Sequence, residues 1–136
     1  MRPVGVSIVA ILNWFHAALF SFGGLVLIVV GHLSGRAMSA LGSGPLAERL
    51  LAALGKTLGF AALLIAVLWL AAGVGLWTLK NWGRSLTLGL TGLWLVFGLF
   101  GLLHRPFPTH LLRVIVDVAI VVYLLTPEVK KLFLAA

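Results

Sequence analysis

Residues 4–30 read VGVSIVAILNWFHAALFSFGGLVLIVV, and His16 is the only ionisable side chain among them. A helix needs about 20 apolar residues to cross a hydrocarbon core about 30 Å thick. The segment therefore predicts a membrane-spanning helix. The apolar core of a secretory signal peptide has only about 7–15 residues and is followed by a small-residue cleavage site. The length of this segment favours a helix that is retained.

Three further apolar segments follow. Residues 58–79 and 86–103 contain no charged side chain. Residues 109–126 contain Arg113 and Asp117, yet at a rise of about 1.5 Å per residue they still form a helix roughly 27 Å long, which can cross a bilayer when long side chains flank its ends. All four spans must be helical, because lipid offers no hydrogen-bond partner to a free backbone group.

The composition supports this assignment. Hydrophobic residues make up 62% of the chain and charged residues 10%, whereas soluble domains carry about 25% charged residues. A water-soluble fold of 136 residues cannot bury so much apolar surface. The sequence therefore predicts one all-α domain over residues 1–136, a polytopic membrane protein with four transmembrane helices in a compact bundle. The chain has no cysteine, which excludes disulfides and thiolate metal sites.

Residues 31–56 form the longest segment outside the four spans. We expect its first half to be irregular. In its second half, Pro45 suits a first helical position, leucines then recur at every fourth position up to Leu54, and Gly55 can end a helix. This pattern predicts a short interfacial helix between the first and second spans, with a lid over a site in the bundle as the alternative. Residues 127–136 predict a second surface segment.

The formal net charge of +7 is spread along the chain as flanks of the spans. Nucleic-acid binding depends on a basic patch or stripe, so we expect no nucleic-acid partner. With four crossings, the ten Lys and Arg residues divide equally between the two sides. The turn from Lys80 to Arg84 and the pair Lys130 and Lys131 lie directly at span ends, which favours cytoplasmic termini. We expect these flanking residues to contact lipid head groups.

Asn13 and His16 are three positions apart on the first span and therefore share one helix face. A histidine inside a membrane is a candidate functional residue, because leaving it in lipid is costly. His16 could ligate the metal of a haem or chlorophyll, with Asn13 fixing the imidazole tautomer. The other histidines fall at span ends, so only a single ligand is available. The alternative is a neutral His16 that forms a hydrogen bond to a neighbouring helix.

Arg113 and Asp117 are four positions apart on the fourth span. Opposite charges at this spacing can stay ionised near a membrane by pairing. We expect a structural ion pair. Asp117 is also the strongest candidate for a proton or cation site, although Glu48 and Glu128 lie outside the spans and form no relay of carboxylates with it.

Glycine is abundant, at 16 residues. Small residues let membrane helices approach closely and gain packing energy. We therefore expect helix packing, within the bundle or against a partner, at Gly73, Gly89, Gly92, Gly98 and Gly101.

No enzyme motif is present. The sequence lacks a P-loop, a dinucleotide fingerprint and a His-Glu-x-x-His motif. His104 and His110 have no nearby Cys, Asp or Glu, which argues against a metal site between the last two spans. We expect a protein that is not an enzyme.

Short motifs surround the spans, namely Arg2-Pro3-Val4-Gly5-Val6 leading into residues 8–12, the turn from Gly75-Leu76-Trp77 to Trp82-Gly83-Arg84, and Tyr123 followed by Pro127-Glu128-Val129-Lys130. Together they resemble a widespread family of small, uncharacterised bacterial membrane proteins with four helices. The resemblance implies a bacterial inner-membrane protein of unknown function and supplies no catalytic residues. Residues 31–56 are not part of it.

These observations favour a non-catalytic integral membrane protein, an accessory or scaffolding subunit whose partners are the lipid bilayer and other membrane protein subunits. One alternative is a pigment- or haem-associated subunit of a photosynthetic or respiratory complex that uses His16. The other is a small transporter or channel component centred on Asp117.

Overall fold

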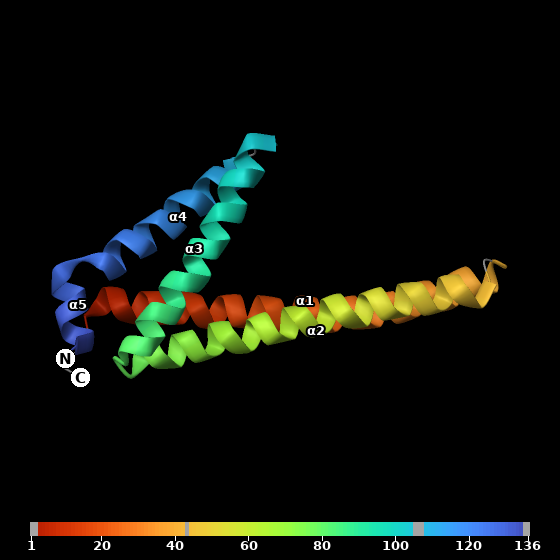
Figure 1. Ribbon diagram of the computed structural model, residues 1–136, viewed down its shortest axis with the longest axis horizontal. Coiled ribbons are helices and arrows are strands. Elements are labelled where there is room, and N and C mark those ends of the chain that lie inside the picture. Colours follow the sequence, from red (N-terminus) through yellow and green to blue (C-terminus); the bar gives the residue numbers. More distant parts are fainter. Residues whose placement is uncertain (1–2, 43, 105–107, 135–136) are drawn as a thin grey trace. The chain divides into compact units, whose positions relative to one another are not determined.

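The computed structural model describes residues 3–42, 44–104 and 108–134, and this part of the chain is helical almost throughout. The helices, in chain order, are α1 (Val4–Ala40), α2 (Gly44–Trp77), α3 (Asn81–His104), α4 (Pro108–Leu125) and α5 (Pro127–Leu134) (Figure 1). The all-α class predicted from the apolar segments is confirmed.

Three of these helices are long and apolar enough to cross a membrane: α1, α2 and the part of α3 over Asn81–Leu103. They contain the first three predicted spans, except for residues 78 and 79, which lie in the turn after α2. Helix α4 covers nearly all residues of the fourth predicted span, and its crossing of the membrane remains a prediction.

Residues 31–56 form no separate interfacial helix, so the predicted irregular segment and the helix end at Gly55 were wrong. Residues 31–40 continue α1, and residues 44–56 are the first part of α2, which does begin beside Pro45. Gly55 does not end α2 because it packs against α1: a Cβ added to Gly55 would lie only 2.6 Å from Gly31 Cα. A tertiary contact thus uses a glycine that the local pattern assigns to a helix end.

The chain divides into two units, and Trp14–Leu68 is one of them. This unit, called the hairpin below, consists of the antiparallel later part of α1 and first part of α2. Close approaches extend along it: a Cβ added to Gly24 would lie 2.8 Å from Gly59 O, and one added to Gly35 would lie 2.7 Å from Glu48 O. The reversal between the helices uses Gly42, whose φ of +83° is readily accessible only to glycine.

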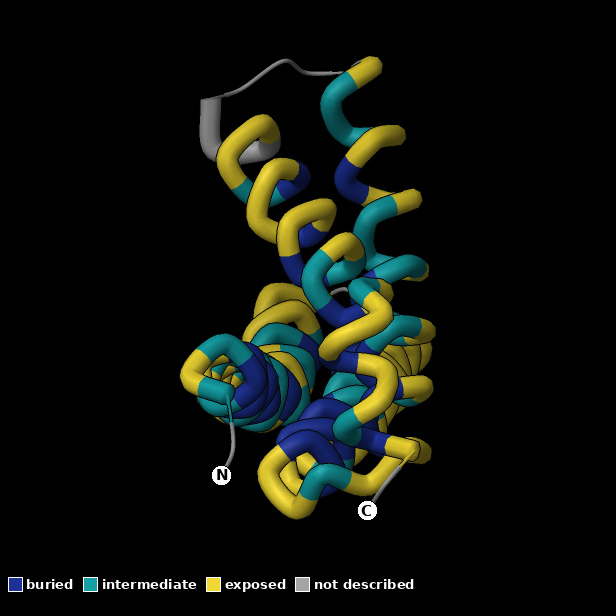
Figure 2. Tube along the Cα trace, turned by 90° about the vertical axis from the view of Figure 1, so that its left-hand side faces the viewer, coloured by how far each residue is buried: buried dark blue, intermediate teal, exposed yellow. Residues whose placement is uncertain are grey.

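The other unit contains Met1–Asn13 and Trp69–Ala136. Its hydrophobic core joins the start of α1, the end of α2, α4 and α5, through Val6, Val9, Ala10, Leu76, Ile120, Leu124, Val129 and Phe133. Helices α3 and α4 pack antiparallel, with their buried positions between them and their outer faces exposed (Figure 2).

Large apolar side chains are exposed on both units. Phe22 and Leu64 of the hairpin are 70% and 68% exposed, and Leu112 of α4 is 66% exposed. In water such surfaces would drive aggregation. On helices that cross a membrane such side chains face lipid, as we expect for Phe22 and Leu64 of α1 and α2.

Candidate functional site

Helix α3 carries three buried polar residues on one face, Arg84, Thr87 and Thr91, which we call the polar row. Their exposed fractions are 8%, 0% and 1%. The spacing of three and four residues aligns them along the helix. Because a polar group without a partner is costly in an apolar environment, the partners of these side chains show what the row does.

Thr87 joins α3 to the start of α1. Asn13 Nδ2 donates to Thr87 Oγ1 over 2.9 Å, and the same hydroxyl donates to Gly83 O over 2.9 Å. Both side chains are buried. The amide of Asn13 thus binds α3, and its role in orienting His16 remains a prediction. His16 itself is half-buried and belongs to the hairpin.

Arg84 joins α3 to the end of α4. Its Nε donates to Leu124 O over 3.0 Å, and its Nη1 donates to Asn81 Oδ1 over 3.3 Å. The last four carbonyls of a helix have no partner within that helix, and Leu124 lies in the last turn of α4. A cation is also favourable at this negative end of the helix dipole. Arg84 therefore caps α4, rather than contacting lipid head groups as predicted.

Arg113 and Asp117 lie within α4, with Arg113 Nε 3.9 Å from Asp117 Oδ2. The Asp117 side chain is 7% exposed and that of Arg113 is 39% exposed. The Arg113 guanidinium also lies over the Trp94 ring of α3, 4.5 Å from its centroid, which is a cation–π geometry. The arginine thus links α4 to α3 as well as facing Asp117.

Thr91 differs from the other members of the polar row. Its Oγ1 is buried and forms no hydrogen bond within the described part of the chain. Hydroxyl and carboxylate oxygens such as those of Thr91 and Asp117 are suitable ligands for hard cations. However, the described residues contain no group of three or more His, Asp or Glu side chains that could hold a metal ion.

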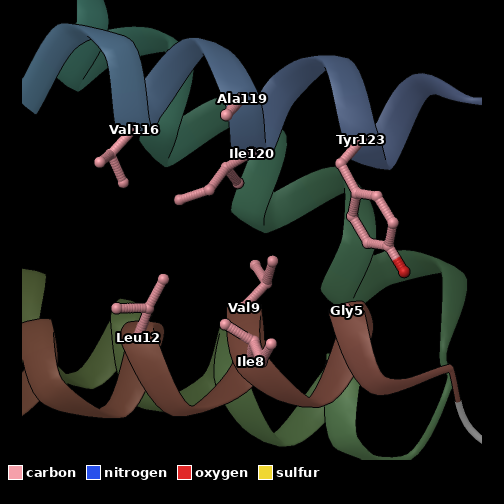
Figure 3. Close-up of a pocket in the computed structure, with 8 residues that line it drawn as sticks. All are labelled: Gly5, Ile8, Val9, Leu12, Val116, Ala119, Ile120 and Tyr123. Atoms are coloured by element: carbon pink, nitrogen blue, oxygen red, sulfur yellow. The ribbon is translucent and has the colours of Figure 1, made fainter.

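An apolar groove of about 270 Å³ lies between the start of α1 and α4. Ile8, Val9 and Leu12 line it from α1, while Val116 and Ile120 approach from α4 (Figure 3). The remaining lining residues are Gly5, Ala119 and Tyr123. Figure 3 places Tyr123 and Gly5 at one end of the groove, and a Cβ added to Gly5 would collide with the Tyr123 ring.

The predicted packing glycines of α3 behave differently from one another. A Cβ added to Gly98 would lie 3.1 Å from Val114 Cγ2, whereas one added to Gly89 or Gly92 would have no atom within 4 Å. The structure therefore shows no packing for Gly89 and Gly92 within the described chain, and packing against a partner remains a prediction. Gly73 is buried on α2 and Gly101 is partly buried on α3.

Two pairs of glycines in the sequence are signals for the hairpin contacts. Gly31 and Gly35 form one small-xxx-small pair, and Gly55 and Gly59 form another. This spacing is a known signal for close helix approach in membranes, but both pairs overlap the segment predicted to lie outside the spans. The capping role of Arg84 has no such local signal.

Comparison with known proteins assigns most of the chain to one protein family. A family model described as "Predicted membrane protein (DUF2127)" matches residues 5–127, which include the polar row, the lining of the groove and the hairpin. No curated protein and no solved structure matches the chain. The family is one of membrane proteins of unknown function, in agreement with the resemblance found in the sequence motifs, and its match also includes residues 31–56, which the resemblance had left out. The match covers well over half of the 136 residues, and the chain therefore belongs to the DUF2127 family of predicted membrane proteins.

Proposed function

We propose that the protein is a non-catalytic accessory or scaffolding subunit that binds other membrane proteins through the end of its hairpin, residues 31–56. The observation that carries this proposal is that helices α1 and α2 are each longer than the hydrocarbon core of a bilayer is thick, and that leucines are exposed where the two helices meet. The apolar surface beyond the hydrocarbon core then needs another partner.

The helix lengths support a projecting hairpin. Helix α1 has 37 residues and α2 has 34, which correspond to about 55 Å and about 51 Å at about 1.5 Å per residue. The hydrocarbon core of a bilayer is about 30 Å thick, which leaves about 17 residues of α1 and about 14 residues of α2 beyond it. The first charged side chain of α1 is Arg36, and Lys56 is the last on α2. The hairpin end therefore contains the charged residues of both helices.

Glycine contacts leave the leucines of the hairpin end free to face outward. Gly31 packs on Gly55 and Gly35 packs on Glu48, so the two backbones touch without larger side chains between them. The exposed leucines of this segment are Leu33, Leu41, Leu46, Leu50 and Leu54. An exposed apolar patch outside the hydrocarbon core is characteristic of a protein interaction site.

The polar row supports a structural role for the other unit. Asn13, Thr87 and Arg84 each form hydrogen bonds that join different helices or stabilise a helix end. These side chains hold the helices in place, and none combines with a second titratable group into a catalytic pair within the described residues. These contacts support a structural role for this unit.

Site-specific photo-crosslinking in cells tests the proposal. A photoreactive amino acid at Leu50 or Leu54 should give a discrete crosslinked product with a membrane protein, while the same probe at Leu64, which is 68% exposed within the apolar part of α2, should not. The variant Leu46→Lys/Leu50→Lys should abolish the product formed at Leu54 and lower the abundance of the partner complex. Equal products at Leu54 and Leu64, or unchanged complex levels in the variant, would refute the proposal.

A further inference from the structure

We propose that the groove between α1 and α4 binds one acyl chain of an anionic phospholipid, whose head group is held by Lys130 and Lys131 of α5. This inference rests on the unit that contains Met1–Asn13 and Trp69–Ala136. It does not depend on what the hairpin binds.

The lining of the groove fits a hydrocarbon chain. Apart from the Tyr123 hydroxyl, the lining side chains have no polar atom. Water needs about two to four polar partners to occupy a cavity stably, and this groove does not supply them. An acyl chain can enter from the side, because Ile8 and Val116 at its margins are exposed.

The end of the groove at Tyr123 leads to α5. Thr126 Oγ1 donates to Tyr123 O over 2.7 Å, and Pro127 begins α5 immediately afterwards. The buried Val129 and Phe133 of α5 belong to the same core cluster as Val9 and Ile120, two residues that line the groove. Helix α5 is therefore held at this end by packing.

The charge of α5 matches an anionic head group. Lys130 and Lys131 are exposed and lie off the buried face formed by Val129 and Phe133, and Glu128 is the only acidic residue of the helix. Basic residues next to a membrane surface attract anionic lipids. The apolar groove thus suits the acyl chain of a phospholipid, and the two lysines suit its anionic head group.

Nearby tryptophans place this end at a membrane–water boundary. The Arg84–Leu124 bond brings the start of α3 beside the end of α4. Trp82, two residues before Arg84 on α3, is 51% exposed, and Trp77, the last residue of α2, is 39% exposed. Tryptophan concentrates at lipid head groups. The lysines therefore lie at the depth where a phosphate is found.

The test uses the purified full-length protein in mild detergent with added phosphatidylglycerol or phosphatidylcholine, and native mass spectrometry counts retained lipid. The wild type should retain one phosphatidylglycerol in preference to phosphatidylcholine. Lys130→Ala/Lys131→Ala should weaken retention about fivefold for each lysine removed. Ala119→Phe should fill the groove and abolish retention. The matched controls are Arg49→Ala/Lys56→Ala, which removes two exposed charges elsewhere, and Ala18→Phe, which enlarges an exposed alanine of the hairpin.

Three outcomes would overturn the proposal. Equal retention of both lipids would show an apolar groove without head-group selection. Loss in the lysine variant with normal retention in Ala119→Phe would show attraction by surface charge alone. A change of oligomeric state in Ala119→Phe without any effect on lipid would show that the groove binds a helix of a second copy.

Discussion

At the scale of single residues, buried polar side chains join helices to one another. Asn13 and Thr87 connect α1 to α3, Arg84 connects α3 to α4, and Arg113 connects α4 to Trp94. In lipid, helices gain little from the hydrophobic effect, so packing and interhelical hydrogen bonds determine which helices associate. The energetic weight of these side chains can be measured one at a time.

Arg84→Ala should destabilise the protein by about 1–3 kcal/mol, because it leaves the buried Leu124 carbonyl without its donor. Arg84→Lys should recover only part of the loss, since an ammonium lacks the planar fork of the guanidinium. The midpoint of unfolding in detergent measures both. Arg49→Ala, which removes an exposed arginine of the hairpin, is the control and should change little. If Arg84→Ala is as stable as this control, the cap contributes nothing.

Asp117 and Arg113 should be energetically coupled. Asp117→Asn should lower stability by about 1–3 kcal/mol, because the buried face of α4 loses the carboxylate that Arg113 approaches. Adding Arg113→Leu should recover part of that loss. A double-mutant cycle of unfolding free energies should give a coupling of about 0.5–3 kcal/mol. Simple additivity of the two mutations would mean that the pair is not coupled.

At the scale of elements, glycine decides how α1 and α2 form the hairpin. The contacts Gly24–Gly59, Gly31–Gly55 and Gly35–Glu48 involve backbone atoms, which cannot move aside as a flexible side chain can. Helices α3 and α4 instead meet through larger side chains, with the contact of Gly98 and Val114 as an exception. The effect of adding a methyl group should therefore differ between the two helix pairs.

Gly55→Ala should destabilise the hairpin, because the added Cβ would lie 2.6 Å from Gly31 Cα and 2.7 Å from Leu27 O. Gly89→Ala is the matched control. Its Cβ would have no atom within 4 Å, so the substitution should be neutral or stabilising by up to about 1 kcal/mol through helix propensity. Thermal unfolding in detergent measures both. The opposite order of stabilities would show that the hairpin does not pack through its glycines.

At the scale of the whole molecule, the number of membrane crossings determines on which side of the membrane α5 lies. Helices α1, α2 and α3 satisfy the length and apolarity of a span. If α4 also crosses, α5 is on the same side as the turn between α2 and α3. If α4 does not cross, α5 is on the side of the hairpin end.

Single-cysteine labelling distinguishes these cases, and the absence of native cysteine makes it direct. We expect Trp82→Cys and Lys131→Cys to react with an impermeant maleimide from one side and Leu41→Cys from the other. Leu41 is suitable because it is 81% exposed. Labelling of Leu41→Cys and Lys131→Cys from the same side would leave only three spans and would contradict the four-span prediction.

The sequence by itself determined that this is an all-helical membrane protein. The uncharged segments 4–30, 58–79 and 86–103 predict the helices because apolarity over about 20 residues is a local property, and so is the need of each backbone group for a partner in lipid. The start of α2 beside Pro45 follows from an equally local rule.

Tertiary structure decided the rest. Whether Gly55 ends a helix or packs inside one depends on Gly31, which lies far away in the chain. Whether Arg84 contacts lipid or caps α4 depends on Leu124, and the partner of Asn13 is Thr87, 74 residues further along. Such pairings depend on how the helices approach one another, and the periodicity of one segment contains no information about its neighbours.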